Sequence, residues 1–262
     1  MTKRWRNAFE PSCAIGAGTS DGDGDVSITT APLFPRWQPF LLVCAVAGGL
    51  AVPLDPVSTP AAAVVVALLG LAGLHVWRWS RLPGLTAGEP WGARDRFVRP
   101  AAWLGLGLAV GLLFLGVLRL LVEPAIPAAG ARLAAAAAVP LWRRALVIYV
   151  AAVSEEVIFR LVLLSFVSGV VMRLFRIADR TPSRNVAWAA NGVSALACAA
   201  VHLPAWYAVG PLSAGLALIV LALNGAGGAV FGYLFVTRGI VAAMWAHAGA
   251  DIATQLVGPL AR

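Results

Sequence analysis

Long apolar runs, separated by short polar or proline-rich segments, make up most of the chain beyond residue 36. Most of these runs are about 20 residues long, which is the length an α-helix needs to cross the hydrocarbon core of a bilayer. The pattern therefore predicts an all-α fold, a polytopic transmembrane helix bundle of about seven spans. We expect these spans at residues 38–55, 61–77, 100–122, 145–172, 187–206, 213–236 and 239–258.

The Ala-rich run Leu133–Val139 leaves the number of spans open. It precedes the fourth apolar run and is followed by Pro140, which interrupts helices because it has no backbone N–H to donate. The fourth span can extend back through this run as an extra partial span. A bundle of eight spans is therefore the alternative to seven.

Residues 1–36 differ from the rest of the chain. They contain a Gly- and Asp-rich stretch at 16–25 and lack the apolar core of a signal peptide. We expect a disordered N-terminal tail here. Residues 37–262 then form one transmembrane helical domain, with no internal repeat and no soluble second domain.

Composition and charge support this interpretation. Apolar residues make up 60% of the chain and charged residues only 12%, which lies outside the range of soluble globular proteins. The net charge of +8 comes from arginines that flank apolar runs, so it indicates membrane topology and excludes a nucleic-acid partner. With the N-terminus inside, most of the 20 Lys and Arg residues fall on the cytoplasmic side. High Ala, Gly and Arg with a single lysine is typical of GC-rich bacterial genomes, so we expect the bacterial cytoplasmic membrane.

The three cysteines give no metal or disulfide signature. An odd number without a pair at metal-ligand spacing indicates neither a disulfide framework nor a zinc-thiolate site. We expect them to be structural, with Cys198 a small buried apolar side chain. They are Cys13, Cys44 and Cys198.

Ionisable residues inside the predicted spans are the main functional signal. A charge in the hydrocarbon core costs several kcal/mol unless it is paired or neutralised, so such residues usually carry function. Interhelical polar contacts are the structural alternative, but two adjacent glutamates suit that role poorly. The six residues are Glu155, Glu156, Arg160, His202, His247 and Asp251.

The spacing of these residues suggests distinct roles. Glu156 and Arg160 are four residues apart on one helical face, so the arginine can neutralise that carboxylate. Glu155 points about 100° away and is left free to act as a general base. His247 and Asp251 are also four residues apart, so Asp251 can orient the imidazole or share a proton with it.

Depth gives a geometric check on this arrangement. At about 1.5 Å of rise per residue, Glu155 and His247 lie near the middle of the bilayer. His202 reaches the same level only if the membrane part of its helix begins near Asn191. The same helix carries a stripe at four-residue steps, consisting of Ser194, Cys198 and His202.

These motifs resemble the CAAX-protease and bacteriocin-processing (CPBP/ABI) family of intramembrane glutamic endopeptidases. The family's Glu-Glu-x-x-x-Arg helix is matched by Glu155, Glu156 and Arg160. Its Phe-x-x-x-His motif is matched by His202, with Cys198 in place of the usual phenylalanine. Its His-x-x-x-Asn/Asp motif is matched by His247 and Asp251, after the turn Thr237-Arg238-Gly239. The resemblance covers residues 145–251 and implies a protease core at about 143–258.

The resemblance also implies roles for the matched residues. Glu155 and His202 would activate a water for attack on a peptide carbonyl, and Glu156 and Arg160 would hold the first motif in shape. His247 would stabilise the oxyanion, with Asp251 supporting it. No covalent intermediate and no cofactor is implied. The expected partners are the lipid bilayer and a substrate that is a membrane-anchored protein or peptide.

Three alternatives remain at this point. A zinc ion bound by Glu155, His202 and His247 is a second mechanism, although no His-Glu-x-x-His helix is present. A transporter or proton relay would also place carboxylates and histidines in spans. Such proteins usually carry broken helices in paired positions, and the interrupted segment 224–228 has no counterpart. The third alternative is a non-catalytic immunity or assembly protein of the same family.

Overall fold

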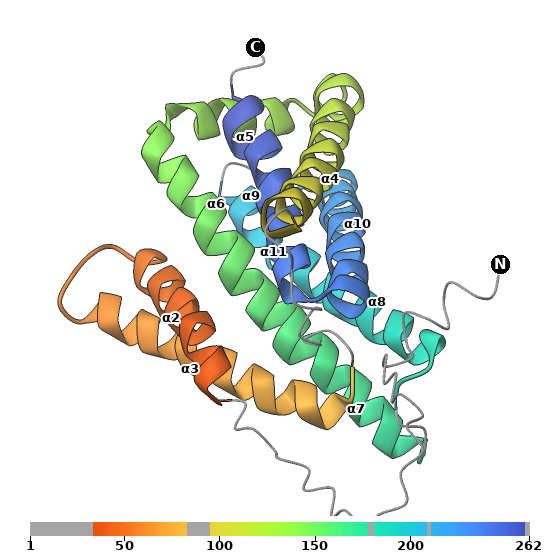
Figure 1. Ribbon diagram of the computed structural model, residues 1–262. Helices are drawn as coiled ribbons and strands as arrows, with labels where there is room; N and C mark the ends of the chain where they lie inside the picture. The colour runs from red at the N-terminus through yellow and green to blue at the C-terminus, as the bar shows by residue number, and fades with distance from the viewer. Residues whose placement is uncertain (1–33, 83–94, 178–180, 209–210, 260–262) are drawn as a thin grey trace, which may run out of the picture.

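The computed structural model describes residues 34–82, 95–177, 181–208 and 211–259, all of them helices and their connections (Figure 1). The predicted tail lies almost wholly outside these ranges. The α-helices are α2 (Phe34–Leu50), α3 (Ser58–Ser80), α4 (Asp95–Val117), α5 (Pro127–Ala138), α6 (Leu141–Glu155), α7 (Ser165–Leu174), α8 (Arg184–Ala200), α9 (Leu203–Tyr207), α10 (Ala214–Arg238) and α11 (Ile240–Asp251). Three π-helical segments continue α4, α6 and α11, namely η1 (Leu118–Val122), η2 (Glu156–Leu164) and η3 (Ile252–Val257).

One long helix, formed by α6, η2 and α7, runs diagonally through the molecule (Figure 1). It is apolar and continuous over Leu141–Leu174, 34 residues, or about 51 Å. On one side it contacts the α2–α3 hairpin, and on the other α8 and α11. Helix α10 packs against α8 and α11, and α4 packs against α11. The long helix is thus the element around which the other helices are arranged.

Six of the seven predicted spans are confirmed as helices long and apolar enough to cross a membrane, among the residues described. The protein is therefore an integral membrane protein by this criterion. The first prediction, residues 38–55, is too long. Its apolar helix covers only Trp37–Leu50, because Pro53 and Pro56 cannot donate the N–H groups that a continuing helix needs.

The loop between α2 and α3 is fixed by Asp55. Its carboxylate accepts hydrogen bonds from the Ser58 hydroxyl and from the backbone N–H groups of Ser58 and Val57. These bonds stabilise the charged form and lower the pKa of Asp55 below its usual value. The carboxylate thereby serves the free N–H groups at the start of α3.

The Ala-rich run does not form an eighth span. It belongs to α5, which has 12 residues and a length of about 18 Å, too short to cross a bilayer. Helix α5 ends at Ala138 and α6 begins at Leu141. Pro140 separates the two helices, as its missing N–H predicts.

The segment 224–228 does not interrupt its helix. Helix α10 is continuous from Ala214 to Arg238, so this stretch lacks the break that a transporter-like site would use. Its small residues allow close packing instead. A Cβ at Gly228 would lie 3.1 Å from Ala195 and 3.3 Å from an Arg160 nitrogen.

A one-residue turn orients α11 against α10. Gly239 connects the two helices with φ 96° and ψ 168°, a conformation that side-chain-bearing residues rarely adopt. Of the predicted turn at residues 237–239, only Gly239 lies outside the helices, because Thr237 and Arg238 belong to α10. The turn determines the direction in which α11 carries His247 back into the bundle.

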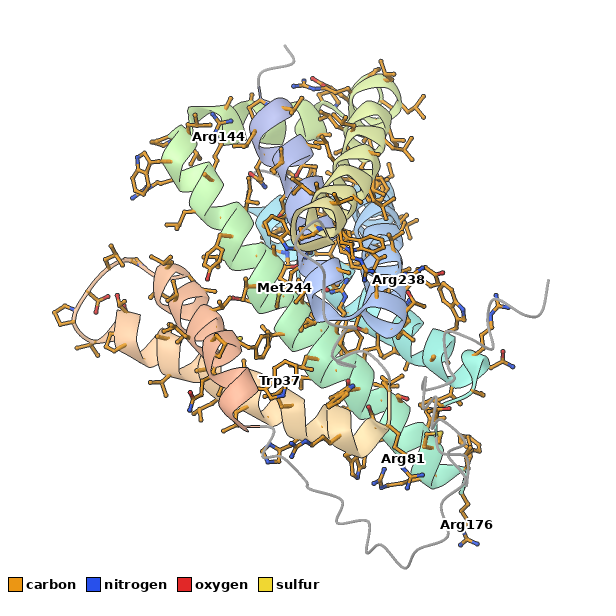
Figure 2. All side chains as sticks on the ribbon, viewed as in Figure 1. Trp37, Arg81, Arg144, Arg176, Arg238 and Met244 are labelled. Atoms are coloured by element: carbon orange, nitrogen blue, oxygen red, sulfur yellow. The ribbon has the colours of Figure 1, made fainter. Side chains whose placement is uncertain are left out.

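Arg81 and Arg176 lie at one end of the molecule, and Arg144 lies near the other end (Figure 2). Arg238 lies between the two ends in this view, near the level of Met244. The end of α10 is thus set back from the end where Arg81 and Arg176 lie.

Helices α4 and α11 cross at close range through glycines. A Cβ at Gly107 would lie 1.7 Å from the carbonyl oxygen of Ala246, and one at Gly249 would lie 2.1 Å from that of Leu104. Small residues at such crossings let helix backbones approach and gain packing energy in a membrane. Because Ala246 precedes His247, this crossing also positions the histidine.

We predict that Gly107→Ala destabilises the protein by about 1–3 kcal/mol, because the methyl group forces α4 away from α11. Gly105→Ala on the same helix is the matched control, since a Cβ there meets nothing within 4 Å. The control should be neutral or slightly stabilising because alanine favours helix. Thermal unfolding of the purified variants in detergent measures both. Equal unfolding temperatures for the two variants would contradict the close crossing.

Candidate active site

The two adjacent glutamates lie where the long helix changes its hydrogen-bonding pattern. Helix α6 ends at Glu155, and the π-helical segment η2 begins at Glu156. Such segments widen the turn and frequently occur at functional sites. Glu156 is fully buried, whereas Glu155 is partly exposed. The junction therefore presents two carboxylates in different surroundings.

Glu156 lies between two nitrogen groups in the interior. Its Oε2 is 3.3 Å from Arg160 Nε, which confirms the predicted pair at four-residue spacing. Its Oε1 is 2.8 Å from His247 Nδ1 on α11. Arg160 Nη2 in turn donates to the carbonyl of Gly228 on α10, at 3.0 Å. These contacts join η2, α10 and α11 around one buried carboxylate.

Asp251 lies on the other side of the His247 ring. Its Oδ2 is 3.7 Å from His247 Nε2, an ion-pair distance that is too long for a hydrogen bond. The ring also stacks on Phe231, with centroids 4.8 Å apart. Asp251 is therefore near His247 as predicted, but the carboxylate that holds the ring by a hydrogen bond is Glu156. No sequence pattern indicated this contact, because Glu156 and His247 are 91 positions apart.

Helix α8 packs along the first motif through the predicted stripe. Ser194 Oγ donates to the carbonyl of Phe159, and Cys198 Sγ lies 3.6 Å from Glu155 Oε2. From the first contact to the second, the residue number rises by four on α8 and falls by four on the glutamate helix, so the two helices run antiparallel and side by side. The stripe therefore faces the glutamate helix.

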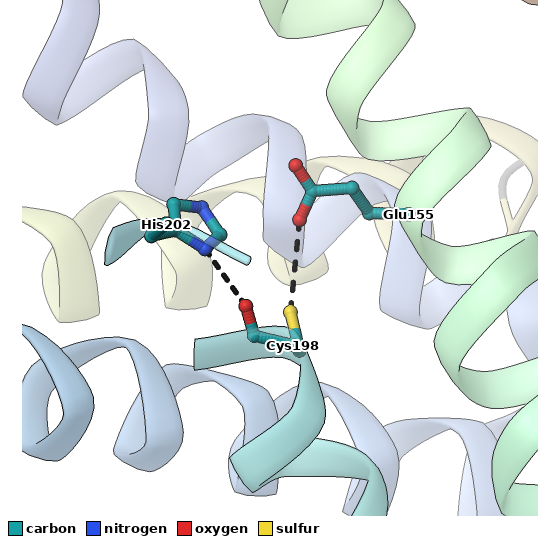
Figure 3. A group of neighbouring side chains, drawn as sticks. All are labelled: Glu155, Cys198 and His202. Atoms are coloured by element: carbon teal, nitrogen blue, oxygen red, sulfur yellow. Dashed lines mark hydrogen bonds between the residues drawn. The ribbon is translucent and has the colours of Figure 1, made fainter. Parts of the chain in front are cut away.

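Glu155, Cys198 and His202 form a second group (Figure 3). His202 lies just after α8, and its Nδ1 is 2.8 Å from the carbonyl oxygen of Cys198. A carbonyl can only accept, so Nδ1 carries the proton and a neutral ring keeps its lone pair on Nε2. Each of the three side chains offers an atom within 4.8 Å of the other two.

The level of His202 is explained by helix length. Helix α8 begins at Arg184, seven residues before Asn191. The neighbouring long helix continues to Leu174, beyond the predicted end of its span. Counted from these adjoining ends, His202 and Glu155 both lie about 27–28 Å along their helices. The two residues therefore meet without shortening α8.

Asn191 is a site neighbour that the motifs did not mark. Its Nδ2 donates to the carbonyl of Ala229 at 2.9 Å. A Cβ at Gly232 would lie 1.8 Å from Asn191 Oδ1, so the glycine provides the space for this side chain. The bond joins α8 to α10 near the residues that contact Arg160. The available sequence signal was a polar amide side chain within a predicted span, about one helical turn before Ser194.

The candidate metal ligands that the structure brings together differ from those of the predicted zinc alternative. In the part of the chain described, the group with metal-ligand spacing is Glu155, Cys198 and His202. His247, which the zinc alternative included, bonds to Glu156 instead. The donor set consists of a carboxylate, a thiol and an imidazole, which are all zinc ligands in proteins.

We predict that Arg160→Met destabilises the protein by about 3–5 kcal/mol, because it leaves Glu156 buried without its counter-charge. The double variant Arg160→Met/Glu156→Gln should recover part of that loss, since it removes the unpaired charge as well. Thermal unfolding in detergent of both variants, with Glu156→Gln alone to complete the cycle, measures the coupling. The interpretation would be contradicted if the double variant lost more unfolding free energy than the two single variants lose together.

Residues 137–253 match the protein-family model described as type II CAAX prenyl endopeptidase Rce1-like. No curated protein and no solved structure matches the chain. The matched segment contains all six ionisable residues of the predicted motifs, in the order that the resemblance requires. The predicted resemblance is thereby confirmed for residues 137–253, which match the Rce1-like type II CAAX prenyl endopeptidase family model.

Proposed function

We propose that the protein is an intramembrane endopeptidase of the CAAX-prenyl-protease type. It hydrolyses a peptide bond of a membrane-anchored protein or peptide with a water activated by Glu155 and His202. The observation that carries this proposal is the difference between the surroundings of the two adjacent glutamates. Glu156 is occupied by Arg160 and His247, whereas Glu155 is partly exposed and faces His202.

The attacking water needs a proton acceptor. The Glu155 carboxylate and the unprotonated Nε2 of His202 are both acceptors, and the two side chains belong to one small group. A water held between them loses its proton to Glu155 as its oxygen attacks the peptide carbonyl. Glu155 then delivers that proton to the leaving amine. Ser154 and Cys198 are not assigned as nucleophiles.

The tetrahedral intermediate carries a negative oxygen that needs a donor. We assign this role to His247, which is held from its Nδ1 by Glu156. Nε2 can donate only when the ring is protonated, so we assign an imidazolium between Glu156 and Asp251. The buried group then has two positive charges, Arg160 and His247, and two negative charges, Glu156 and Asp251. This balance suits a region of low dielectric.

The substrate class is inferred from the family match and from the composition of the chain. The family name describes prenyl endopeptidases, whereas the Ala-, Gly- and Arg-rich composition is typical of GC-rich bacteria, where prenylated proteins are not expected. We therefore propose a membrane-anchored bacterial protein or peptide as substrate, and the bacterial cytoplasmic membrane as the location. Neither cofactor nor metal is assigned to the reaction.

We predict that Glu155→Gln lowers proteolysis by about 10²–10⁴-fold, the usual contribution of a general base. The measurement compares membrane-protein termini by mass spectrometry in host cells that express the wild type or the variant at equal levels. Termini that require Glu155 would also identify the substrate. Glutamine keeps the size of the side chain, so folding should be preserved.

Ser154→Ala is the matched control for this experiment. Its hydroxyl is buried next to Glu155 and has no hydrogen-bond partner, so its loss should not affect the chemistry. The control variant should produce the wild-type termini. An identical set of termini in the wild type and in folded Glu155→Gln would count against proteolysis and favour a non-catalytic member of the family.

A further inference from the structure

Cys198 occupies the position where family members usually have phenylalanine, and it brings a thiol to the two residues assigned to water activation. Its Sγ lies 3.6 Å from Glu155 Oε2. The thiol, the carboxylate and the His202 imidazole converge within 4.8 Å. Figure 3 shows Glu155, from the long helix, and His202, from the turn after α8, above Cys198. Such a set of donors is also a ligand set for a metal that prefers sulfur and nitrogen.

The spacing fits a tetrahedral zinc ion. Zn–O distances of about 2.0–2.2 Å and a Zn–S distance of about 2.3 Å place the two ligand atoms about 3.5–3.6 Å apart. The Glu155 oxygen and the Cys198 sulfur already have this separation. The imidazole nitrogen lies within 4.8 Å of both atoms, so it needs to move closer by at most about 1.4 Å.

The surroundings favour binding at these atoms. The bond from His202 Nδ1 to the Cys198 carbonyl fixes the ring with Nε2 unprotonated, as metal-bound histidines usually require. Cys198 is 4% exposed, whereas Glu155 and His202 are partly open, so a water can take the fourth position.

The charges also balance. A dipositive ion with one carboxylate, one thiolate and one neutral imidazole forms a neutral complex, and the thiol proton leaves to solvent. The nearby positive charge of Arg160 is already paired with Glu156. Metal binding therefore changes the net charge of these three side chains from −1 to zero.

We propose that Glu155, Cys198 and His202 form an inhibitory site for a thiophilic divalent cation such as Zn²⁺. The inhibitory effect rests on the proposed function, because the ion takes up the carboxylate and the imidazole that activate the water. Cys198 supplies the sulfur ligand of this site. A phenylalanine there supplies no ligand atom.

The first measurement is metal binding by the purified full-length protein in detergent. Zn²⁺ is titrated calorimetrically, and Co²⁺ is added as a spectroscopic probe whose bond to a thiolate gives a charge-transfer absorption band. The expected result is one ion per chain and a thiolate band. Cys198→Ala should weaken Zn²⁺ affinity by at least about 100-fold, since even the loss of an outer-shell partner costs 10–100-fold.

Cys44→Ala is the matched control, because Cys44 is the other buried free cysteine of the described segments and lies on α2. It should keep wild-type binding and the thiolate band, as should Cys13→Ala. His202→Ala, which retains the thiol, should weaken binding as much as Cys198→Ala. Zn²⁺ affinity unchanged in Cys198→Ala, or a cobalt complex without a thiolate band, would overturn the site.

Activity separates this inference from the proposed function. Zn²⁺ should inhibit Glu155-dependent cleavage in the wild type, and a chelator should restore it. In Cys198→Ala, the Zn²⁺ concentration that gives half inhibition should be about 100-fold higher. Each variant is normalised to its own metal-free rate. Zinc binding without any cleavage would refute the protease and leave the site. Cleavage without zinc binding would refute the site alone. Cleavage that a chelator abolishes and Zn²⁺ restores would overturn the inhibitory role.

Discussion

A fully buried carboxylate in a membrane protein is tolerated only when nearby groups neutralise it, and Glu156 imposes this requirement on the bundle. Its partners come from its own helix, through Arg160, and from α11, through His247. Arg160 also reaches the Gly228 carbonyl on α10. Removing water from these charges costs several kcal/mol per ion, so the contacts must form together. The register of the three elements therefore depends on this one carboxylate.

The second carboxylate acquires a different character because of the first. Glu155 is only one residue away, yet it lies at the end of α6 while Glu156 opens η2. Arg160 and His247 are both used by Glu156, so neither holds Glu155. Helix α8 faces Glu155 with Cys198 and carries His202 at its end. Glu156 is thus held inside the bundle by its charged partners, whereas Glu155 is left beside Cys198 and His202.

Helices outside the family match also support the site. The match begins at residue 137, but α3 packs against η2 and α4 packs against α11. At the second crossing, Gly107 lies against the carbonyl of Ala246, the residue before His247. The Gly239 turn fixes the other end of α11. His247 is therefore placed by a helix that the family motifs do not include, as well as by its contact with Glu156.

The sequence by itself determined the helical membrane fold, six spans and the Glu156–Arg160 pair, because these follow from residue type and from spacing within a single helix. It also contained the motifs of the family. The hydropathy pattern overextended the first span, because hydropathy does not register that Pro53 and Pro56 lack the N–H groups that a continuing helix needs.

Only the tertiary structure decided which residues meet across helices. The contact of Glu156 with His247, the position of Cys198 beside Glu155 and the level of His202 depend on crossing angles and helix lengths. Those quantities arise from packing between segments distant in the chain, whereas periodicity records only the face of each helix.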